Sequence, residues 1–448
     1  MTIAAEGQKP TAVAVELTVA DWRAPDPADF AFWFGLIQSP ESVALEYDVP
    51  LWSQAHLKLL DRSFALIAQT GGKVLFIHLT AESEYGNKRS MVIWDKGPDG
   101  KLTADLTPVE KFVKTAAGHF KPTFVPVCVW QWPDSGKAPL ITVRDPKTGK
   151  LENVAAPANG TDEALAFWKP VLTGVKAILD KAALEGRMLL ATGSDRYPKP
   201  ATVAMFHKIL PDVAWEAHRH YPRGGQSMRG EGTNVPVKYI SSVWGQWSNW
   251  DPSDRRVQGW KFAAGKQGTL WTWLDRRTYD PAGFTRFRVM CEQTLLADRR
   301  GLGQIGADFW PAPPEKKGAY RAGTLFSRFP RSANVGAGNK GCTTNQLFYP
   351  GPNGAVPTLR YQLIRENILE CEARIFLEKF LVAKPCPLPP ALAAKCQKVL
   401  DERTRWHRVG FNQATGDVNI SWAYSGWAQR AGKLFAAAGE AARAAAKK

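Results

Sequence analysis

Three aspartates occupy positions from which they could do acid–base chemistry. Asp195, Asp275 and Asp308 each lie at or just beyond the end of a short apolar run. Two carboxyl groups that face one cavity can divide the work of cleaving an acetal: one protonates the leaving oxygen and the other stabilises or attacks the neighbouring carbon. These aspartates are therefore the candidate catalytic residues.

Aromatic, basic and imidazole side chains follow the same apolar runs. Indole faces stack on the apolar faces of sugar rings, and guanidinium groups bind carboxylate or sulfate through paired hydrogen bonds. The chain contains 18 tryptophans, several of them clustered. The candidate substrate-binding residues are Trp130, Arg196, His218, His220, Trp244, Trp271, Trp273, Arg276 and Trp310. Together with the aspartates they form the lining expected of a carbohydrate site.

Each candidate also has a purely structural interpretation. Asp195 could be a turn residue, Asp275 could pair with a neighbouring arginine, and Asp308 could be a satisfied core carboxylate. His218 and His220 alternate along one strand, so only one of them can face a shared interior. Neither histidine has a third ligand at metal-site spacing, and we expect no metal and no cofactor.

The elements that must position these residues alternate between apolar runs and helical segments. The predicted strands are 43–48, 73–80, 124–131, 188–194, 214–219, 237–243, 269–274 and 303–309. The predicted helices between them are 52–69, 162–183, 200–209 and 282–300. Continuous buried runs separated by helices indicate an α/β protein with a parallel sheet, and eight of them predict a (β/α)8 TIM barrel. The candidate residues would then share the barrel's carboxyl edge, where the active sites of this fold lie.

The predicted organisation has three parts. Residues 1–30 form an N-terminal β-segment, with a strand over 11–20, and a linker. Residues 31–311 form the barrel, and residues 312–448 form a C-terminal extension of loops and helices packed on it. The extension's predicted helices are 358–382, 391–408 and 427–448.

Composition excludes several classes of protein. The 448 residues are 44% hydrophobic and 22% charged, which excludes disordered, collagen-like and coiled-coil chains. No apolar run approaches the ~18 residues of a membrane span. The start of the chain lacks the features of a signal peptide. The six cysteines form no CxxC pair, although Cys386 and Cys396 are close enough in sequence to pair.

The charge balance is 58 basic against 42 acidic residues, a net charge of +16. Such a balance favours polyanionic partners or simply keeps the protein soluble. The basic residues are scattered, and no nucleic-acid-binding motif is present, which argues against nucleic acid. We expect an oligosaccharide or polysaccharide partner, sulfated or otherwise anionic. The oligomeric state is not determined by the sequence.

The segment TLRYQLIRENILECEARIFLEKFL at 358–381 resembles the closing segment of the glycoside hydrolase family 123 catalytic domain. Supporting similarities are GLGQIGADFW at 301–310, LFYPGPNGAVPTLR at 347–360 and ELTVADWRAPDPADF at 16–30. The resemblance implies a β-N-acetylgalactosaminidase-like barrel that cleaves with retention and uses the substrate's 2-acetamido group as nucleophile. It also implies a periplasmic or extracellular location.

Members of this family carry an Asp-Glu pair after a barrel strand, and the matching pair here is Asp195-Arg196. By this resemblance Asp195 orients the acetamido group. Arg196 cannot be the general acid, because a guanidinium does not release its proton near neutral pH. Asp308 or Asp275 would then supply the proton to an amino-sugar or anionic oligosaccharide. The alternative is a catalytically inactive, carbohydrate-binding barrel.

Overall fold

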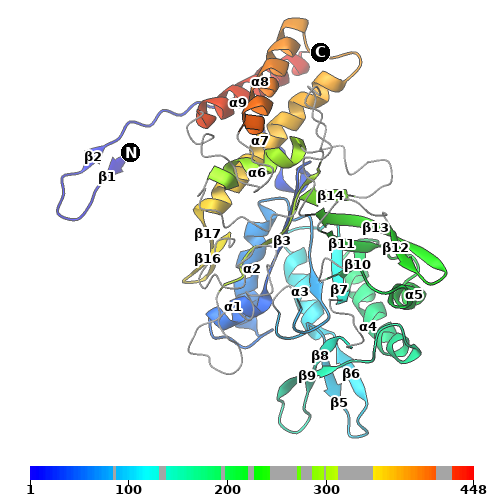
Figure 1. Ribbon diagram of the computed structural model, residues 1–448. Helices are drawn as coiled ribbons and strands as arrows, with labels where there is room; N and C mark the ends of the chain where they lie inside the picture. The colour runs from blue at the N-terminus through cyan, green and yellow to red at the C-terminus, as the bar shows by residue number, and fades with distance from the viewer. Residues whose placement is uncertain are drawn as a thin grey trace.

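The structure is a computed structural model, shown in Figure 1. It describes residues 1–83, 87–130, 138–192, 197–219, 227–242, 270–273, 285–296, 299–310, 347–409 and 426–447.

Eight parallel strands form the centre of the protein. They are β3 (Trp33–Ile37), β4 (Ile77–His78), β7 (Val125–Trp130), β10 (Met188–Thr192), β11 (Trp215–Arg219), β13 (Thr233–Ser242), β14 (Leu270–Trp273) and β15 (Gly301–Gly306). Their spatial order is β3-β15-β14-β13-β11-β10-β7-β4. From β4 to β15, each of these strands therefore lies beside the member of the set that precedes it in the sequence. The first strand, β3, pairs with the last, β15. A ninth strand, β12 (Ser227–Gly230), pairs antiparallel with β13.

The inner face of this sheet is packed across its width. The Trp33 ring of β3 lies 5.3 Å from the Tyr239 ring of β13 and 5.6 Å from Phe124. A Cβ atom on Gly35 would lie 3.1 Å from the Tyr239 hydroxyl and 3.2 Å from Val74, just before β4. In the described chain no ladder of hydrogen bonds joins β3 to β4. The mixed α/β class is confirmed, and in the described residues β3 and β4 stand at the two edges of the parallel sheet.

Helices follow most of the strands and cover the outer face of the sheet (Figure 1). They are α1 (Pro40–Glu46), α2 (Gln54–Ala68), α3 (Thr107–Ala117), α4 (Asp162–Lys181), α5 (Pro200–Ile209) and α6 (Thr285–Leu296). Side-chain caps set several of their starts: Ser53 accepts from the backbone N–H of His56, and Thr161 accepts from that of Ala164. The predicted helices at 52–69, 162–183, 200–209 and 282–300 are confirmed as α2, α4, α5 and α6.

A separate four-stranded sheet extends from one end of the parallel strands (Figure 1). This accessory sheet has the order β6 (Leu102–Asp105), β5 (Ile93–Lys96), β8 (Leu140–Arg144) and β9 (Leu151–Ala155). Its first hairpin follows β4 and its second follows β7, and β5 pairs with β8 in parallel. The sequence analysis did not predict this sheet. The remaining short elements are β1 (Thr2–Ile3), β2 (Thr11–Ala12), η1 (Pro27–Asp29), β16 (Phe348–Gly351) and β17 (Gly354–Pro357).

Three long helices close the C-terminal part, as predicted: α7 (Leu359–Val382), α8 (Pro390–Val409) and α9 (Trp427–Ala446). Two of them, α7 and α8, are joined to α6 by buried ions. The carboxylate of Glu292 accepts from Arg374 at 2.9 Å and from Arg403 at 3.0 Å, and it also contacts His407. Because buried charges are tolerated only when paired, these contacts fix the packing of α6, α7 and α8.

Two strand predictions are wrong. Residues 43–48 lie largely in helix α1, because Ser39 caps its first turn and Pro40 occupies its first position. The missing eighth strand is β3, whose five residues are all buried. Of the predicted strand at 11–20, only Thr11–Ala12 is paired. The cysteines Cys386 and Cys396 are both free thiols.

None of the helices in the described ranges is long and apolar enough to cross a membrane. The predicted domain boundaries at residues 30 and 311 stay a prediction.

The pairing of β3 with β15 depends on a glycine. A Cβ atom on Gly301 would lie 1.9 Å from the backbone carbonyl oxygen of Trp33. The two strands could not stay paired at this distance without a shift of the backbone. We expect Gly301→Ala to lower the free energy of unfolding by about 2 kcal/mol or more. Urea unfolding followed by circular dichroism measures the change.

The matched control is Gly432→Ala in α9, where a Cβ atom meets nothing within 4 Å. This substitution should be neutral or stabilise by up to about 1 kcal/mol, because alanine favours helix over glycine. Equal midpoints for the two variants would contradict the assigned role of Gly301.

Candidate active site at the carboxyl ends of the parallel strands

The register of the sheet brings predicted site positions to one edge. Thr192, the last residue of β10, pairs with Trp130 at the end of β7. On β11, His218 pairs with Ser241 of β13, and the next residue of β13 pairs with Trp273 of β14. Because the strands are parallel, the segments that follow them leave from this carboxyl edge.

The alternation along β11 directs two polar side chains inward. Trp215 and Ala217 pack in the outer core between sheet and helices. Glu216 and His218 therefore lie on the opposite, inner face. Glu216 is fully buried and His218 is 6% exposed. Glu216 was not among the predicted site residues. Apolar and polar residues alternate in the Trp-Glu-Ala-His segment, and this alternation could have indicated that Glu216 shares a face with His218.

Two other reactive groups on the inner face are held neutral. Burial lowers the pKa of His78, at the end of β4, to about 3. Burial, with the nearby charge of Glu216, raises the pKa of the Cys128 thiol well above its usual value. A protonated thiol is a poor nucleophile, so Cys128 is not suited to covalent catalysis.

Asp308 lies two residues beyond β15 and is fully buried. Its carboxylate accepts from the backbone N–H of Ser39 at 2.8 Å, the Ser63 hydroxyl at 2.6 Å and the Gln38 amide at 3.0 Å. Burial raises its pKa to about 6, although these hydrogen bonds oppose the shift. The carboxylate thus joins the end of β15 to the end of β3 and to α2.

The two described indoles of the predicted set lie in the interior. Trp130 and Trp310 are each 1% exposed and belong to the main apolar core. The Trp310 indole donates to the carbonyl of Phe348 at 2.9 Å and packs edge-on against Tyr47. In this structure neither ring presents a face to solvent.

For the remaining predicted site residues, the structure describes no side chains. Trp271 and Trp273 are described as backbone of β14 only. The residues outside the described ranges are Asp195, Arg196, His220, Trp244, Asp275 and Arg276. Among the residues that are described, no group of histidine, cysteine and acidic side chains could hold a metal ion.

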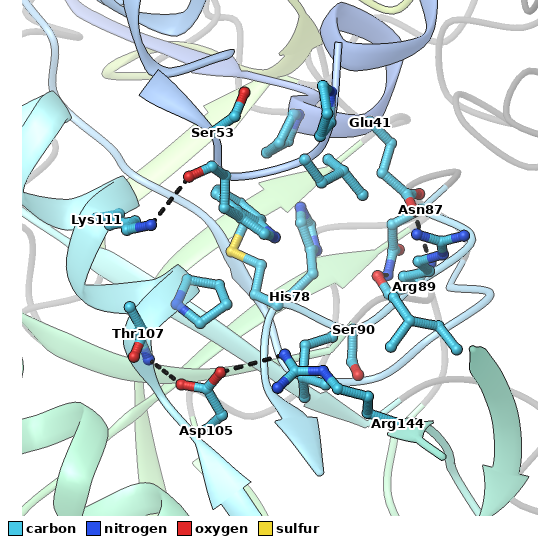
Figure 2. Close-up of a pocket in the computed structure, with 18 residues that line it drawn as sticks. Glu41, Ser53, His78, Asn87, Arg89, Ser90, Asp105, Thr107, Lys111 and Arg144 are labelled. Atoms are coloured by element: carbon cyan, nitrogen blue, oxygen red, sulfur yellow. Dashed lines mark hydrogen bonds and ion pairs between the residues drawn. The ribbon is translucent and has the colours of Figure 1, made fainter. Parts of the chain in front are cut away.

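A pocket of ≈510 Å³ adjoins the carboxyl end of β4 (Figure 2). Its walls come from the start of α1, the segment before α2, the start of α3 and the accessory sheet. Figure 2 shows His78 between these walls, with charged side chains around it. The charged residues that line the pocket are Glu41, Arg89, Asp105, Lys111 and Arg144.

The raised pKa of Asp308 has a consequence for stability. Because its folded pKa of about 6 exceeds the ordinary 3.8, the folded protein retains a proton that the unfolded chain has lost between these pH values. The free energy of unfolding should therefore fall as pH rises through this window, by at most about 3 kcal/mol from this group.

We expect Asp308→Asn to remove this pH-dependent part of the free energy of unfolding. The variant should therefore gain stability relative to wild type as pH rises from 4 to 6. Asparagine keeps the shape, and Gln38 can turn its amide oxygen toward the new NH2 group. Urea unfolding of both proteins at a series of pH values gives the difference. Parallel profiles would show that Asp308 does not titrate in this range.

The comparisons with known proteins point to one family. The catalytic-domain model of glycoside hydrolase 123 matches residues 37–221. A structure of a family 123 glycoside hydrolase from Clostridium perfringens, studied for glycolipid glycan hydrolysis, is similar in fold with a TM-score of 0.61. At 14% identity, the alignment covers 97% of this chain and 74% of that one. None of the curated proteins compared matches the chain. Residues 37–221, which run from the end of β3 through β11, are therefore similar to the glycoside hydrolase family 123 catalytic domain, and the fold is similar to that of a family member.

Proposed function

We propose that this protein is a glycosidase that hydrolyses a glycosidic bond of an amino-sugar glycan at the carboxyl edge of its parallel sheet. The observation that carries the proposal is the family match over residues 37–221, which includes β10 and the segment directly after it. By analogy with the Clostridium perfringens enzyme, the substrate class is the glycan of a glycolipid. We further propose that the sheet closes into a (β/α)8 barrel, supported by the packing of Gly35 against both Tyr239 and Val74.

The proposed reaction retains configuration and uses the substrate's own acetamido group. Asp195, three positions after the end of β10, would orient and polarise that group so that its oxygen attacks the anomeric carbon. The C–O bond to the leaving sugar breaks as a carboxylic acid gives its proton to the leaving oxygen. Water then opens the cyclic intermediate and restores the acetamido group.

Asp275 or Asp308 is the proposed proton donor. A pKa of about 6 suits Asp308 to this role, since a general acid works best near the operating pH. Its complete burial and three hydrogen-bond partners favour a positioning role instead. Asp275 lies outside the described residues, two positions after the end of β14 in the sequence.

The proposed sugar contacts are aromatic and polar. The stacking surface of Trp271 and Trp273 stays a prediction. His218 would bind a hydroxyl group from the inner face of β11. Arg196 and Arg276 would bind an anionic substituent through paired hydrogen bonds. The family resemblance supports a periplasmic or extracellular location.

A carbohydrate-binding protein without hydrolase activity is the second candidate. It is favoured by Arg196, which stands where the family carries its glutamate acid. Such a protein would bind the same glycan and leave it intact.

The proposed reaction predicts strong dependence on Asp195 and on the acetamido group. With an aryl β-N-acetylgalactosaminide, Asp195→Asn should lower kcat at least about 100-fold, the scale of a lost acid–base or polarising group. The corresponding aryl β-galactoside, which lacks the acetamido group, should not be cleaved. Release of the aryl alcohol measures both.

An unchanged kcat in Asp195→Asn would remove this residue from the site. Equal cleavage of the galactoside would exclude the substrate-assisted route. Glycan binding without turnover by the wild-type protein would establish the binding protein instead.

A further inference from the structure

The pocket beside β4 has a surplus of positive charge. Three basic side chains, Arg89, Lys111 and Arg144, line it together with two acids, Glu41 and Asp105. Both acids are already engaged within the protein. The carboxylate of Glu41 accepts from the backbone N–H groups of Lys88 and Arg89. That of Asp105 accepts from the backbone N–H of Thr107 at 2.9 Å and from Arg144 at 3.4 Å.

Two of the cations have no acidic partner among the described residues. Lys111 donates from Nζ to the carbonyl oxygen of Trp52 at 3.0 Å, a contact that leaves its charge unbalanced. In the described part of the chain, neither Lys111 nor the guanidinium of Arg89 forms an ion pair. Both side chains are only partly exposed. Cations in a partly desolvated hollow attract an anion more strongly than the same groups on an open surface.

An aromatic residue lines the same pocket in an unusual backbone conformation. Trp52 has φ +64°, in the left-handed region that bulky residues rarely adopt. Its N–H donates to Nδ1 of His56 at 3.0 Å, and its carbonyl accepts from Lys111. The indole packs edge-on against His56 and Phe112. Strained residues held by several contacts are concentrated at ligand-binding sites.

These observations carry one inference, which rests on the proposed function. We propose that this pocket is a subsite for an acidic sugar unit of the glycan, whose carboxylate or sulfate is bound by Arg89 and Lys111 and whose ring packs against Trp52. The volume of ≈510 Å³ lies within the range of small-ligand sites. Since His78 ends β4 and lines the pocket, the subsite adjoins the carboxyl edge that carries the proposed reaction.

The test compares charged with neutral sugars. Calorimetry should show that N-acetylgalactosamine 6-sulfate binds at least about tenfold more tightly than N-acetylgalactosamine, because a charge-assisted hydrogen bond stabilises by about 1.5–3 kcal/mol. Glucuronic acid against glucose provides the carboxylate arm. Selectivity in one arm alone identifies which anion the subsite accepts, and no selectivity in either arm overturns the proposal.

Variants then locate the binding. Arg89→Gln and Lys111→Gln should each reduce the affinity for the charged sugar about tenfold and leave that for the neutral sugar unchanged. Arg89→Lys should recover part of the loss. The matched control is Lys147→Gln, which removes the same charge from an exposed position in the turn between β8 and β9. Equal losses in Arg89→Gln and Lys147→Gln would show a general charge effect and overturn the subsite.

Failure of the subsite and failure of the proposed function give different results. If wild-type protein cleaves the neutral aryl substrate but Arg89→Gln has no selective effect on binding, the reaction stands and the subsite is wrong. If wild-type protein cleaves nothing but loses acidic-sugar binding selectively in Arg89→Gln, the subsite stands and the reaction is wrong. Melting temperatures of all variants confirm that they are folded.

Discussion

The pairing of the first parallel strand with the last determines where the other elements can lie. β3 and β15 lie far apart in the sequence, yet their backbones meet at Gly301 with no room for a side chain. The start of β3 is held by α7, where Glu372 accepts from the backbone N–H of Phe32 at 2.6 Å. Its far end is held by Asp308 through Ser39. Each attachment buries a carboxylate that must find a donor, so the strand can occupy only one position.

The inner face of the sheet combines tight packing with buried polar groups. Gly35, which has no side chain, leaves space for the Tyr239 hydroxyl near the centre, and the backbone of Gly303 lies beside it. Closer to the carboxyl edge, inward side chains are polar: His78 on β4, and Glu216 and His218 on β11. An apolar core would be served as well by aliphatic residues, whereas buried ionisable groups are concentrated at functional sites. The change from apolar to polar along the strands supports this edge as the reactive one.

The accessory sheet and the C-terminal helices lie at opposite ends of the molecule (Figure 1). The accessory sheet is built from segments that follow β4 and β7, so it extends the carboxyl edge and supplies one wall of the charged pocket. The C-terminal helices instead bind α6 through the Glu292, Arg374 and Arg403 contacts. Removing one partner there would leave a buried charge uncompensated, which costs several kcal/mol.

The sequence by itself determined the elements whose signals are local. Apolar runs such as 125–130 and 188–192 became strands, and the periodic segments at 54–68 and 359–382 became helices. The resemblance to family 123 was also read from residue identity, but the family model matches residues 37–221 and does not reach the 358–381 segment, whose resemblance stays a prediction. The pattern failed at 43–48, where a Ser-Pro helix start outweighed the apolar residues after it.

Only the tertiary structure decided which distant residues meet. Asp308 is satisfied by Ser39 and Ser63, more than 240 positions away, and no spacing rule connects them. The accessory sheet was not predicted because its strands are short and partly exposed, and β5 finds its partner β8 only through folding. Glu216 is recognisable as an interior carboxylate only once both faces of β11 are assigned. Local propensity specifies an element, whereas burial and electrostatic pairing are properties of the neighbours that folding brings together.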